Sequence, residues 1–342
     1  MVRGTMPRDA LQQLNPRRVL IIKPSALGDI VQALPVLSGL RQRWPSACFD
    51  WVVKENFAGL LAGHPDLQRV LIFPRRRAWT RLPHLVAELS GYDLVIDLQG
   101  LFRSAALAWL SGAPRRLGFR HSREGAWLAY TDRLDTPVQQ MPAVLANWSV
   151  AEALGCTGPP PPIRLGLTAE HHRRAAALLT GVPRPLLAVH VGASWPTKRW
   201  PVGHFACLLQ WARQQFDVGV VVVGGPGEEP LAAHLPAHVN LVGRTDLLTL
   251  AAVLHSAQFM LSNDSGPMHL AAALGTPVLA PFTCTSPLRA GPYGAGHTVV
   301  ATTVSCAASY LRHCPTMHCM HELTPERLWP VLSARLRTLQ AA

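Results

Sequence analysis

The segment that decides the fold reads Arg18-Val-Leu-Ile-Ile-Lys23-Pro-Ser-Ala-Leu-Gly-Asp29. Its first part is a short apolar run rich in β-branched residues, which is typical of a buried strand. A turn containing proline and serine follows, and an amphipathic stretch from about Asp29 to Arg43 predicts a helix. A strand, a loop and a helix in this order predict one unit of a parallel sheet that is covered by helices.

The same pattern continues along the chain and restarts after the proline-rich joint Gly158–Pro162. Further strands are predicted at Phe49–Val53, Val70–Phe73, Tyr92–Asp97, Leu186–His190, Val218–Val223, Phe259–Ser262 and Pro277–Ala280. The expected fold class is therefore α/β, with two Rossmann-like, doubly wound parallel-sheet domains that face a central cleft. We expect an N-terminal domain over residues 1–165, a C-terminal domain over residues 166–323 and a closing helix over residues 324–342.

The composition is that of a two-domain globular protein. Of the 342 residues, 49% are hydrophobic and 15% are charged, which is enough to build one large core or two medium ones. No apolar run approaches the roughly 20 residues needed to cross a bilayer, and the N-terminus lacks the apolar stretch of a signal peptide. We therefore expect a cytoplasmic protein whose seven cysteines are reduced.

Positive charge is concentrated in the N-terminal half. The formal net charge is +12, and residues 1–165 carry 20 Lys+Arg against 12 Asp+Glu. Short arginine clusters occur at Arg75–Arg77, at Arg115-Arg116, and at Arg120 with Arg123. Such clusters attract a phosphorylated glycolipid, a membrane surface or a nucleic acid, although a general enrichment in arginine gives the same count. No aromatic platform interleaves with the arginines, so the sequence does not favour a nucleic-acid partner.

In the C-terminal half, Asp264-Ser265-Gly266 follows a predicted strand and precedes a helix expected over Pro267–Leu274. Backbone N–H groups at such a helix start point to one place and form an anion site that suits a diphosphate. An ordinary capped helix explains the same residues. His269, taken alone, is more often a packed or capping histidine than a catalyst.

Two other strand ends carry groups that suit a nucleotide. The loop Val189–Pro201 holds hydroxyls and two cations, of which Lys198 is a point charge able to neutralise a diphosphate leaving group. The glycine-rich loop Val223–Glu229 offers two carboxylates to a ribose diol, and a plain turn is the alternative. Neither dinucleotide-binding nor P-loop spacing occurs, which argues against a dehydrogenase or an NTPase.

Asp29 stands at the start of a helix in the N-terminal half. The helix dipole stabilises a carboxylate at this position, from which it could take a proton from a sugar hydroxyl. An N-cap without a catalytic role is the alternative interpretation.

Taken in order, these segments resemble the ADP-heptose:lipopolysaccharide heptosyltransferases of glycosyltransferase family 9, over about residues 18–335. The similar stretches are Ile21–Pro35, Tyr92–Ser104, the Lys198 loop, Gly224-Gly225-Pro226 and Asn263–His269. The resemblance implies a GT-B fold and a metal-independent, inverting transfer of heptose from ADP-L-glycero-D-manno-heptose, without a cofactor. It further implies an anionic lipopolysaccharide-core acceptor and peripheral contact with the inner face of the cytoplasmic membrane.

The resemblance also implies roles for single residues. Asp29 matches the family's proposed general base and Lys198 its diphosphate-binding lysine, so these two are the expected catalytic residues. Arg120 and Arg123 match the acceptor side. The expected donor-binding residues are Ser194, Thr197, Lys198, Glu228, Thr245, Asp264, Ser265, Gly266 and His269. In GT-B folds a C-terminal helix commonly returns to the first domain, and we expect residues 324–342 to do so.

Cys306, Cys314 and Cys319 form a separate stretch with histidines beside two of them. Three thiolates and a histidine are able to bind zinc or iron, but the paired CxxC spacing of common structural sites is missing. We expect reduced cysteines here, with a metal as the alternative.

Three other functions stay open besides transfer to lipopolysaccharide. One is a related glycosyltransferase that acts on a protein or another glycan, and another is a non-catalytic sugar-nucleotide-binding protein on the same fold. A sugar-nucleotide epimerase of the GT-B fold is a more distant alternative. The presence of Asp29 and Lys198 argues against the non-catalytic function. The basic N-terminal half favours an anionic glycolipid over a neutral protein acceptor.

Overall fold

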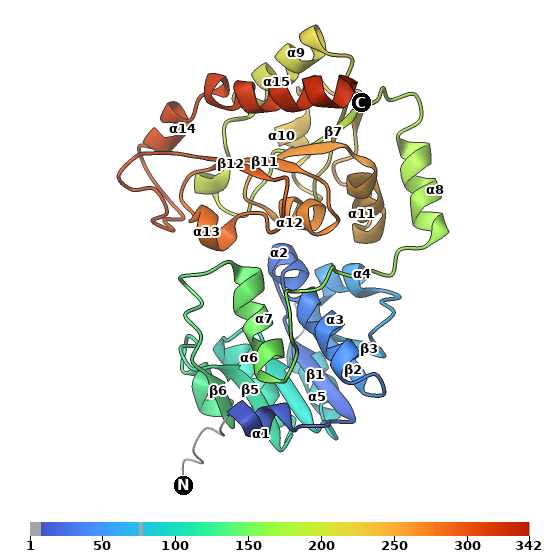
Figure 1. Cartoon of the computed structure of the whole chain (residues 1–342), viewed down its shortest axis with the longest axis vertical. Coiled ribbons are helices and arrows are strands. Elements are labelled where there is room, and N and C mark those ends of the chain that lie inside the picture. The colour runs from blue at the N-terminus through green and yellow to red at the C-terminus, as the bar shows by residue number, and fades with distance from the viewer. Residues whose placement is uncertain (1–7, 75–77, 342) are drawn as a thin grey trace. The chain divides into compact units, whose positions relative to one another are not determined.

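The computed structural model describes residues 8–74 and 78–341. The chain divides into two compact units, residues 1–166 and residues 167–342 (Figure 1). No helix in the described part of the chain combines the length and the apolar character that a membrane span requires. The arginine cluster at Arg75–Arg77 lies outside the described residues.

The N-terminal unit is built on a parallel six-stranded sheet with the order β3-β2-β1-β4-β5-β6. The strands are β1 (Arg18–Ile22), β2 (Cys48–Lys54), β3 (Arg69–Phe73), β4 (Leu94–Asp97), β5 (Arg115–Phe119) and β6 (Asp132–Leu134). The helices are α1 (Arg8–Gln12), α2 (Leu27–Val31), α3 (Leu34–Arg43), η1 (Glu55–Phe57), α4 (Ala58–Leu61), α5 (Ala78–Glu88), α6 (Phe102–Leu110), η2 (Ala126–Ala129) and α7 (Ala143–Ala153). The central strands β1 and β4 are buried almost throughout, as their continuous apolar runs predict for strands covered on both faces.

The helix expected from Asp29 to Arg43 is two helices, α2 and α3. Pro35 explains the break, because its nitrogen carries no hydrogen to donate to the carbonyl of Val31. It is the second residue of α3, where a proline is tolerated. The result is that α2 is a helix of five residues, directly after β1, with Asp29 in its first turn.

The C-terminal unit has a second parallel six-stranded sheet, with the order β12-β11-β10-β7-β8-β9. Its strands are β7 (Leu186–His190), β8 (Gly219–Val222), β9 (Val239–Asn240), β10 (Phe259–Ser262), β11 (Val278–Phe282) and β12 (Thr298–Ala301). Its helices are α8 (Ala169–Leu178), η3 (Pro196–Lys198), α9 (Val202–Gln215), α10 (Glu229–Ala232), α11 (Leu247–Ser256), α12 (Gly266–Ala273), α13 (Pro287–Ala290), α14 (His318–Glu322) and α15 (Pro325–Ala341). When the strands of each sheet are numbered from 1 in chain order, both sheets have the order 3-2-1-4-5-6.

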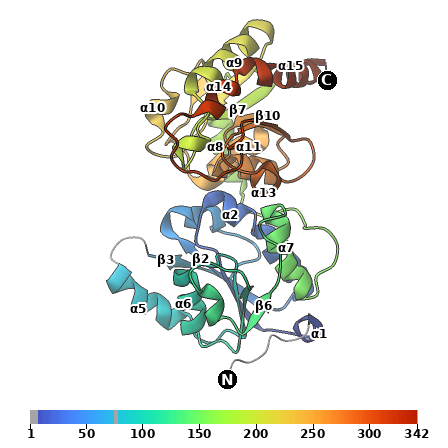
Figure 2. The same ribbon diagram turned by 90° about the vertical axis from the view of Figure 1, so that its left-hand side faces the viewer.

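The closing helix α15 packs inside the C-terminal unit. Leu328, Leu332 and Leu336 are four residues apart, fall on one face of the helix and are buried in the core of this unit. Trp329 packs edge-on against Trp211 of α9 with ring centroids 5.5 Å apart, and both views show α15 beside α9 (Figures 1 and 2). We expected this helix to return to the N-terminal domain. Its apolar stripe instead covers α9 and the sheet of its own unit, because burial there removes these leucines from water.

Each sheet has its topological switch point between its first and fourth strands, β1 with β4 and β7 with β10. Open α/β sheets bind ligands beyond the carboxyl ends of the strands at this point. In the N-terminal unit β1 leads into α2 with Asp29, and in the C-terminal unit β10 leads into α12 just after Asp264. The fold therefore singles out these two turns.

Candidate functional site

Lys198 and Asp264 form an ion pair at the switch point of the C-terminal sheet. Lys198 is the last residue of η3, which follows β7, and Asp264 follows β10. The two strands lie side by side in parallel, with Ser262 opposite His190, so both loops leave the same edge. The distance from Nζ to Oδ2 is 2.7 Å, and the side chains are 14% and 5% exposed. Lys198 is thus held in place while part of it remains accessible.

The Asp264 carboxylate has further partners. The Thr285 hydroxyl donates to Oδ2 at 2.7 Å, and His269 Nε2 lies 3.8 Å from Oδ1. These contacts fix the carboxylate and, together with the charge of Lys198, offset the repulsion it would exert on a bound anion.

The start of α12 lies directly beside this pair. Ser265 is the N-cap, and its Oγ accepts a hydrogen bond from the Met268 N–H at 3.4 Å. Pro267 stands at the second helical position and Gly266 is half-buried. The helix start carries partial positive charge, so it complements Lys198 as an anion-binding feature.

His190 joins two of the expected donor-binding residues. This last residue of β7 is 3% exposed, and its Nδ1 lies 3.0 Å from Ser265 Oγ while its Nε2 lies 3.1 Å from Glu228 Oε2. Glu228 also accepts the Gly225 N–H at 2.8 Å. Burial opposes ionisation of Glu228, but its hydrogen bonds from His190 and Gly225 and the charge of Arg199 outweigh this, so its pKa lies below the usual value.

Sequence reasoning did not single out His190. The signal that could have found it is a polar residue at the carboxyl end of the otherwise apolar strand Leu186–His190. Two positions beside Glu228 need glycine, because a Cβ at Gly192 or Gly224 would collide with the Glu228 carboxylate. The two glycines therefore leave the room that Glu228 occupies.

A second missed feature is an aromatic ring that lies close to two cations. Lys198 Nζ and the Arg312 guanidinium carbon each lie 4.8 Å from the ring centroid of Trp195. Arg312 is exposed and comes from a loop far along the chain, so no local pattern predicts its place. The Trp195 ring places a second positive charge near the Lys198 loop.

The remaining expected donor residues are not joined to the ion pair by contacts found in the described residues. Thr197 is buried, and its hydroxyl donates to the Leu311 carbonyl at 2.7 Å, which ties the loop to the rest of the unit. Ser194 is exposed on the same loop. Thr245 is half-buried and precedes Asp246, the N-cap of α11.

In the N-terminal unit, Asp29 is exposed and its Oδ2 accepts the Ala26 N–H at 2.9 Å. The carboxylate thus caps the turn from within α2 and remains open to solvent. Hydrogen bonds also join the segments that follow β1 and β4. Lys23 Nζ donates to the Leu98 carbonyl at 2.7 Å, and Gln99 Oε1 accepts the Ser25 N–H at 3.4 Å.

Arg120 and Arg123 follow β5 and therefore leave the carboxyl edge of the same sheet. The Arg120 side chain is 64% exposed, with Nη1 3.8 Å from Asp135 Oδ2. Arg123 is exposed, and its N–H donates to the Gly100 carbonyl at 3.1 Å. Both guanidinium groups are accessible to an anionic ligand.

The three cysteines of the Cys306–Cys319 stretch differ in exposure. Within residues 8–74 and 78–341, no three His, Cys, Asp or Glu side chains are grouped so that they could hold a metal ion. Cys306 is exposed and Cys314 half-buried, whereas Cys319 is buried. Burial and the neighbouring thiols raise the pKa of Cys319, which favours its protonated form.

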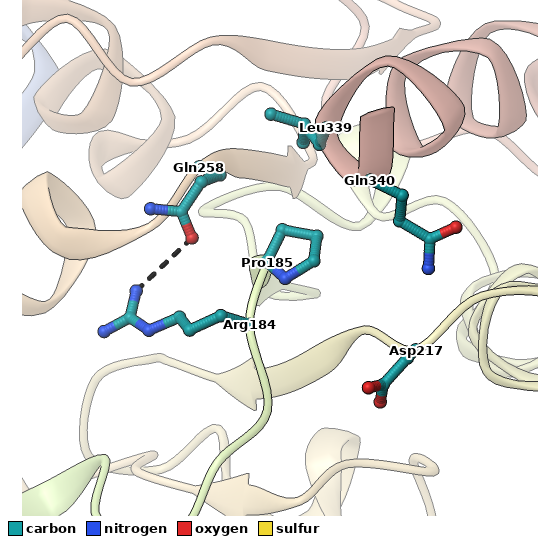
Figure 3. Close-up of a pocket in the computed structure, with 6 residues that line it drawn as sticks. All are labelled: Arg184, Pro185, Asp217, Gln258, Leu339 and Gln340. Atoms are coloured by element: carbon teal, nitrogen blue, oxygen red, sulfur yellow. Dashed lines mark hydrogen bonds between the residues drawn. The ribbon is translucent and has the colours of Figure 1, made fainter. Parts of the chain in front are cut away.

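A pocket of the C-terminal unit lies at the opposite edge of its sheet (Figure 3). Arg184 and Pro185 precede β7, Asp217 precedes β8 and Gln258 precedes β10, so the pocket is at the amino ends of these strands. Leu339 of α15 also lines it. Because ligands of doubly wound sheets bind at the carboxyl ends, this pocket is separate from the candidate site.

Comparisons with known proteins identify the family of the chain. The family model of glycosyltransferase family 9 (heptosyltransferase) matches residues 84–320. Lipopolysaccharide heptosyltransferase 1 of Escherichia coli K12 is 32% identical over 300 residues, covering 81% of this chain and 91% of the relative. Lipopolysaccharide heptosyltransferase 1 of Pseudomonas aeruginosa is 29% identical over 361 residues, covering 93% and 98%. The solved structure of the E. coli heptosyltransferase WaaC with ADP-2-deoxy-2-fluoro heptose gives a TM-score of 0.72 at 28% identity, covering 93% of this chain and 99% of that one. With the two parallel sheets of a GT-B fold and a family match over most of its length, this chain belongs to glycosyltransferase family 9, the heptosyltransferases.

Proposed function

We propose that the protein transfers heptose from ADP-L-glycero-D-manno-heptose to the inner core of lipopolysaccharide. The observation that carries this proposal is the ion pair of Lys198 and Asp264 beside the start of α12. A lysine charge and a helix N-terminus at one switch point suit a diphosphate. The likeness to WaaC bound to an ADP-heptose analogue and to lipopolysaccharide heptosyltransferase 1 supports the choice of donor and acceptor.

The C-terminal unit would bind the donor. Lys198 neutralises negative charge that grows on the diphosphate as ADP departs, with the N-terminus of α12 as a second positive group. Glu228 stays ionised and accepts hydrogen bonds from the ribose hydroxyls, since its pKa is lowered and its position is fixed by His190. Because these groups belong to the protein, we propose that the transfer needs no metal ion and no cofactor.

The N-terminal unit would supply the base. Asp29 is exposed at the carboxyl end of β1, where a sugar hydroxyl can reach it. In the proposed step the acceptor oxygen attacks the anomeric carbon on the face opposite ADP, and its proton passes to Asp29. The bond from that carbon to the phosphate oxygen breaks with its electron pair on ADP, so the anomeric configuration inverts.

The acceptor is an anionic, lipid-linked core. Arg120 and Arg123 offer exposed positive charge on the same sheet edge as Asp29, within the half of the chain that carries most of the net charge. A lipid-linked acceptor is embedded in a membrane. We therefore propose that the protein works in the cytoplasm, in peripheral contact with the inner face of the cytoplasmic membrane.

A donor panel with the purified protein tests this function. We expect ADP-heptose to raise the melting temperature, and release of ADP to require a defined lipid-linked inner-core acceptor. The variant Lys198→Ala should fold like the parent but no longer release ADP from the donor. Activity should persist in EDTA.

Other outcomes would change the assignment. A melting shift with UDP-sugars and none with ADP-sugars would refute the donor. Transfer to a protein or another glycan, with none to the core, would refute the acceptor. Binding of ADP-heptose without release of ADP for any acceptor would indicate a non-catalytic protein, and loss of activity in EDTA that Mg²⁺ restores would reject the metal-independent mechanism.

A further inference from the structure

Helix α6 of the N-terminal unit is apolar on two sides. Its inner side buries Ala105, Leu107 and Ala108 in the core that covers one face of the sheet. Its outer side carries Phe102 and Trp109, which are 64% and 63% exposed and lie two turns apart on one face. A helix at the surface of a globular protein ordinarily presents polar residues to water, so the outer side of α6 is unusual.

The short helix η2 extends this apolar surface. It packs on α6, and the preceding loop is fixed to the start of α6 because the Phe102 N–H donates to Glu124 Oε2 at 3.0 Å. Trp127 and Leu128 of η2 are 39% and 68% exposed. We call Phe102, Trp109, Leu110, Trp127 and Leu128 the α6–η2 surface. In the described part of the chain, these five are the majority of the eight large hydrophobic side chains that are exposed.

Arginines border the α6–η2 surface. Arg103 is exposed on α6, and the Arg133 guanidinium carbon lies 4.9 Å from the centroid of the Trp127 ring. Arg120 and Arg123 precede η2. Residues 102–135 contain six arginines and three acidic residues.

The acidic residues of this segment already have partners. Glu124 accepts the Phe102 N–H, and Asp132 lies 3.6 Å from Arg115. Asp135 lies beside Arg120 and His121. The charge that borders the apolar residues is therefore positive.

We propose that the α6–η2 surface seats the protein on a bilayer that contains anionic phospholipid. Tryptophan and phenylalanine side chains favour the interface between lipid headgroups and acyl chains. The bordering arginines complement lipid phosphates, and the attraction falls off within a Debye length. Figure 2 shows α6 on the outside of the N-terminal sheet, and its side chains Phe102 and Trp109 are exposed.

Two arguments count against the other occupants. A second copy of the chain, joined by two-fold symmetry, would bring the same arginines against each other. A nucleic acid would match the charge and stack on the aromatic rings, but it would leave the exposed aliphatic side chains Leu110 and Leu128 without the apolar phase that a bilayer offers them. This inference extends the membrane contact of the proposed function, and its test requires neither donor nor acceptor.

Vesicle flotation with the full-length protein tests the inference. We expect binding to vesicles of equal parts phosphatidylcholine and phosphatidylglycerol, weaker binding to pure phosphatidylcholine, and loss of binding at high salt. Trp109→Ser combined with Leu128→Ser should reduce the partition coefficient about tenfold or more. Arg103→Gln should weaken binding to the anionic vesicles only. Leu288→Ser is the matched control, because Leu288 is 60% exposed in the C-terminal unit, and it should bind like the parent.

Failure of this inference is distinguishable from failure of the proposed function. Equal binding by the parent and the double variant, equal loss in Leu288→Ser, or no binding of the parent to anionic vesicles would overturn it. Concentration-dependent dimerisation that the double variant abolishes, without vesicle binding, would assign the surface to a second copy.

The double variant should keep the parent's melting temperature and its rate with a delipidated acceptor, and a drop in either would show a structural role instead. A parent that binds vesicles but transfers no heptose would leave the inference intact and refute only the proposed function.

Discussion

At the scale of single residues, Asp29 combines two properties that one substitution separates. Its carboxylate accepts the Ala26 N–H at 2.9 Å and is also exposed. Asparagine keeps the size and the accepting oxygen, but it cannot accept the proton of an attacking hydroxyl. We predict that Asp29→Asn folds and binds ADP like the parent while turnover drops by about 10²–10⁴-fold.

Thermal melting with and without ADP, together with steady-state ADP release, measures both effects. Turnover within a few-fold of the parent would remove Asp29 from the mechanism and leave it only the role of a cap. A lower melting temperature together with lower turnover would point to the capping hydrogen bond.

His190 is the second residue on which the site depends. It lies between Ser265 Oγ and Glu228 Oε2, so replacement by phenylalanine leaves two polar groups without this partner. We predict that His190→Phe weakens ADP binding roughly tenfold, and that adding Glu228→Gln costs little more, because the two side chains act together. His204→Phe on α9 is the matched control, since this half-buried histidine packs on Trp200.

Calorimetric titration of the single and double variants with ADP gives the coupling. Additive losses from the His190 and Glu228 substitutions would show that the histidine acts elsewhere. An equal loss in His204→Phe would show a general effect on the unit.

At this scale the sequence predicts which loops carry site residues, but not which contacts those residues make. The strand ends that carry Lys198 and Asp264 could be located from hydrophobic patterns, but their 2.7 Å contact depends on which strands are neighbours. His190 looks like part of an apolar strand until its two partners are known. Arg312 reaches the Trp195 ring from a distant loop, and no local pattern carries such information.

At the scale of elements, α15 depends on three leucines that join the C-terminal core. Leu332 is fully buried, so Leu332→Ala removes packed atoms and leaves a cavity. We predict a loss of about 2–5 kcal/mol in the free energy of unfolding. Leu339→Ala, on the same helix but half-buried, should cost less than about half as much.

Urea unfolding followed by circular dichroism measures both variants. Equal and small losses for Leu332 and Leu339 would mean that α15 is not part of the core.

The sequence predicts elements well where one signal dominates. β1, β2, β4, β7 and β10 are rich in apolar residues, and the structure places strands there within a residue or two. β5, β6, β9 and β12 were not predicted, because β5 begins with two arginines, β9 has only two residues, and β6, β9 and β12 are at or near sheet edges. The destination of α15 was missed because its apolar stripe fits any apolar surface, and only tertiary structure selects one.

At the scale of the whole molecule, the two units have separate sheets and separate cores. We predict two transitions in scanning calorimetry. A saturating concentration of ADP should raise the temperature of only one transition. Ligand binding stabilises the unit that binds it, by about 2.7 kcal/mol when the free ligand is at 100 times its Kd. Leu332→Ala should lower that same transition, because both changes act on the C-terminal unit.

A single transition that ADP raises as a whole would contradict this prediction. If ADP raises one transition and Leu332→Ala lowers the other, ADP binds to the N-terminal unit. The proposed roles of Lys198 and Glu228 would then be wrong.

All strand pairs found in the described residues close within one unit, so no backbone ladder crosses the joint near residues 158–166. For recombination, this joint is a crossover point at which two relatives can exchange halves without breaking a sheet. Under the proposed function, a chimaera made there would inherit its nucleotide preference from one parent and its acceptor preference from the other. Sugar and acceptor choice would then diverge separately in a lineage, and new pairings would arise by exchange of halves rather than by rebuilding a site.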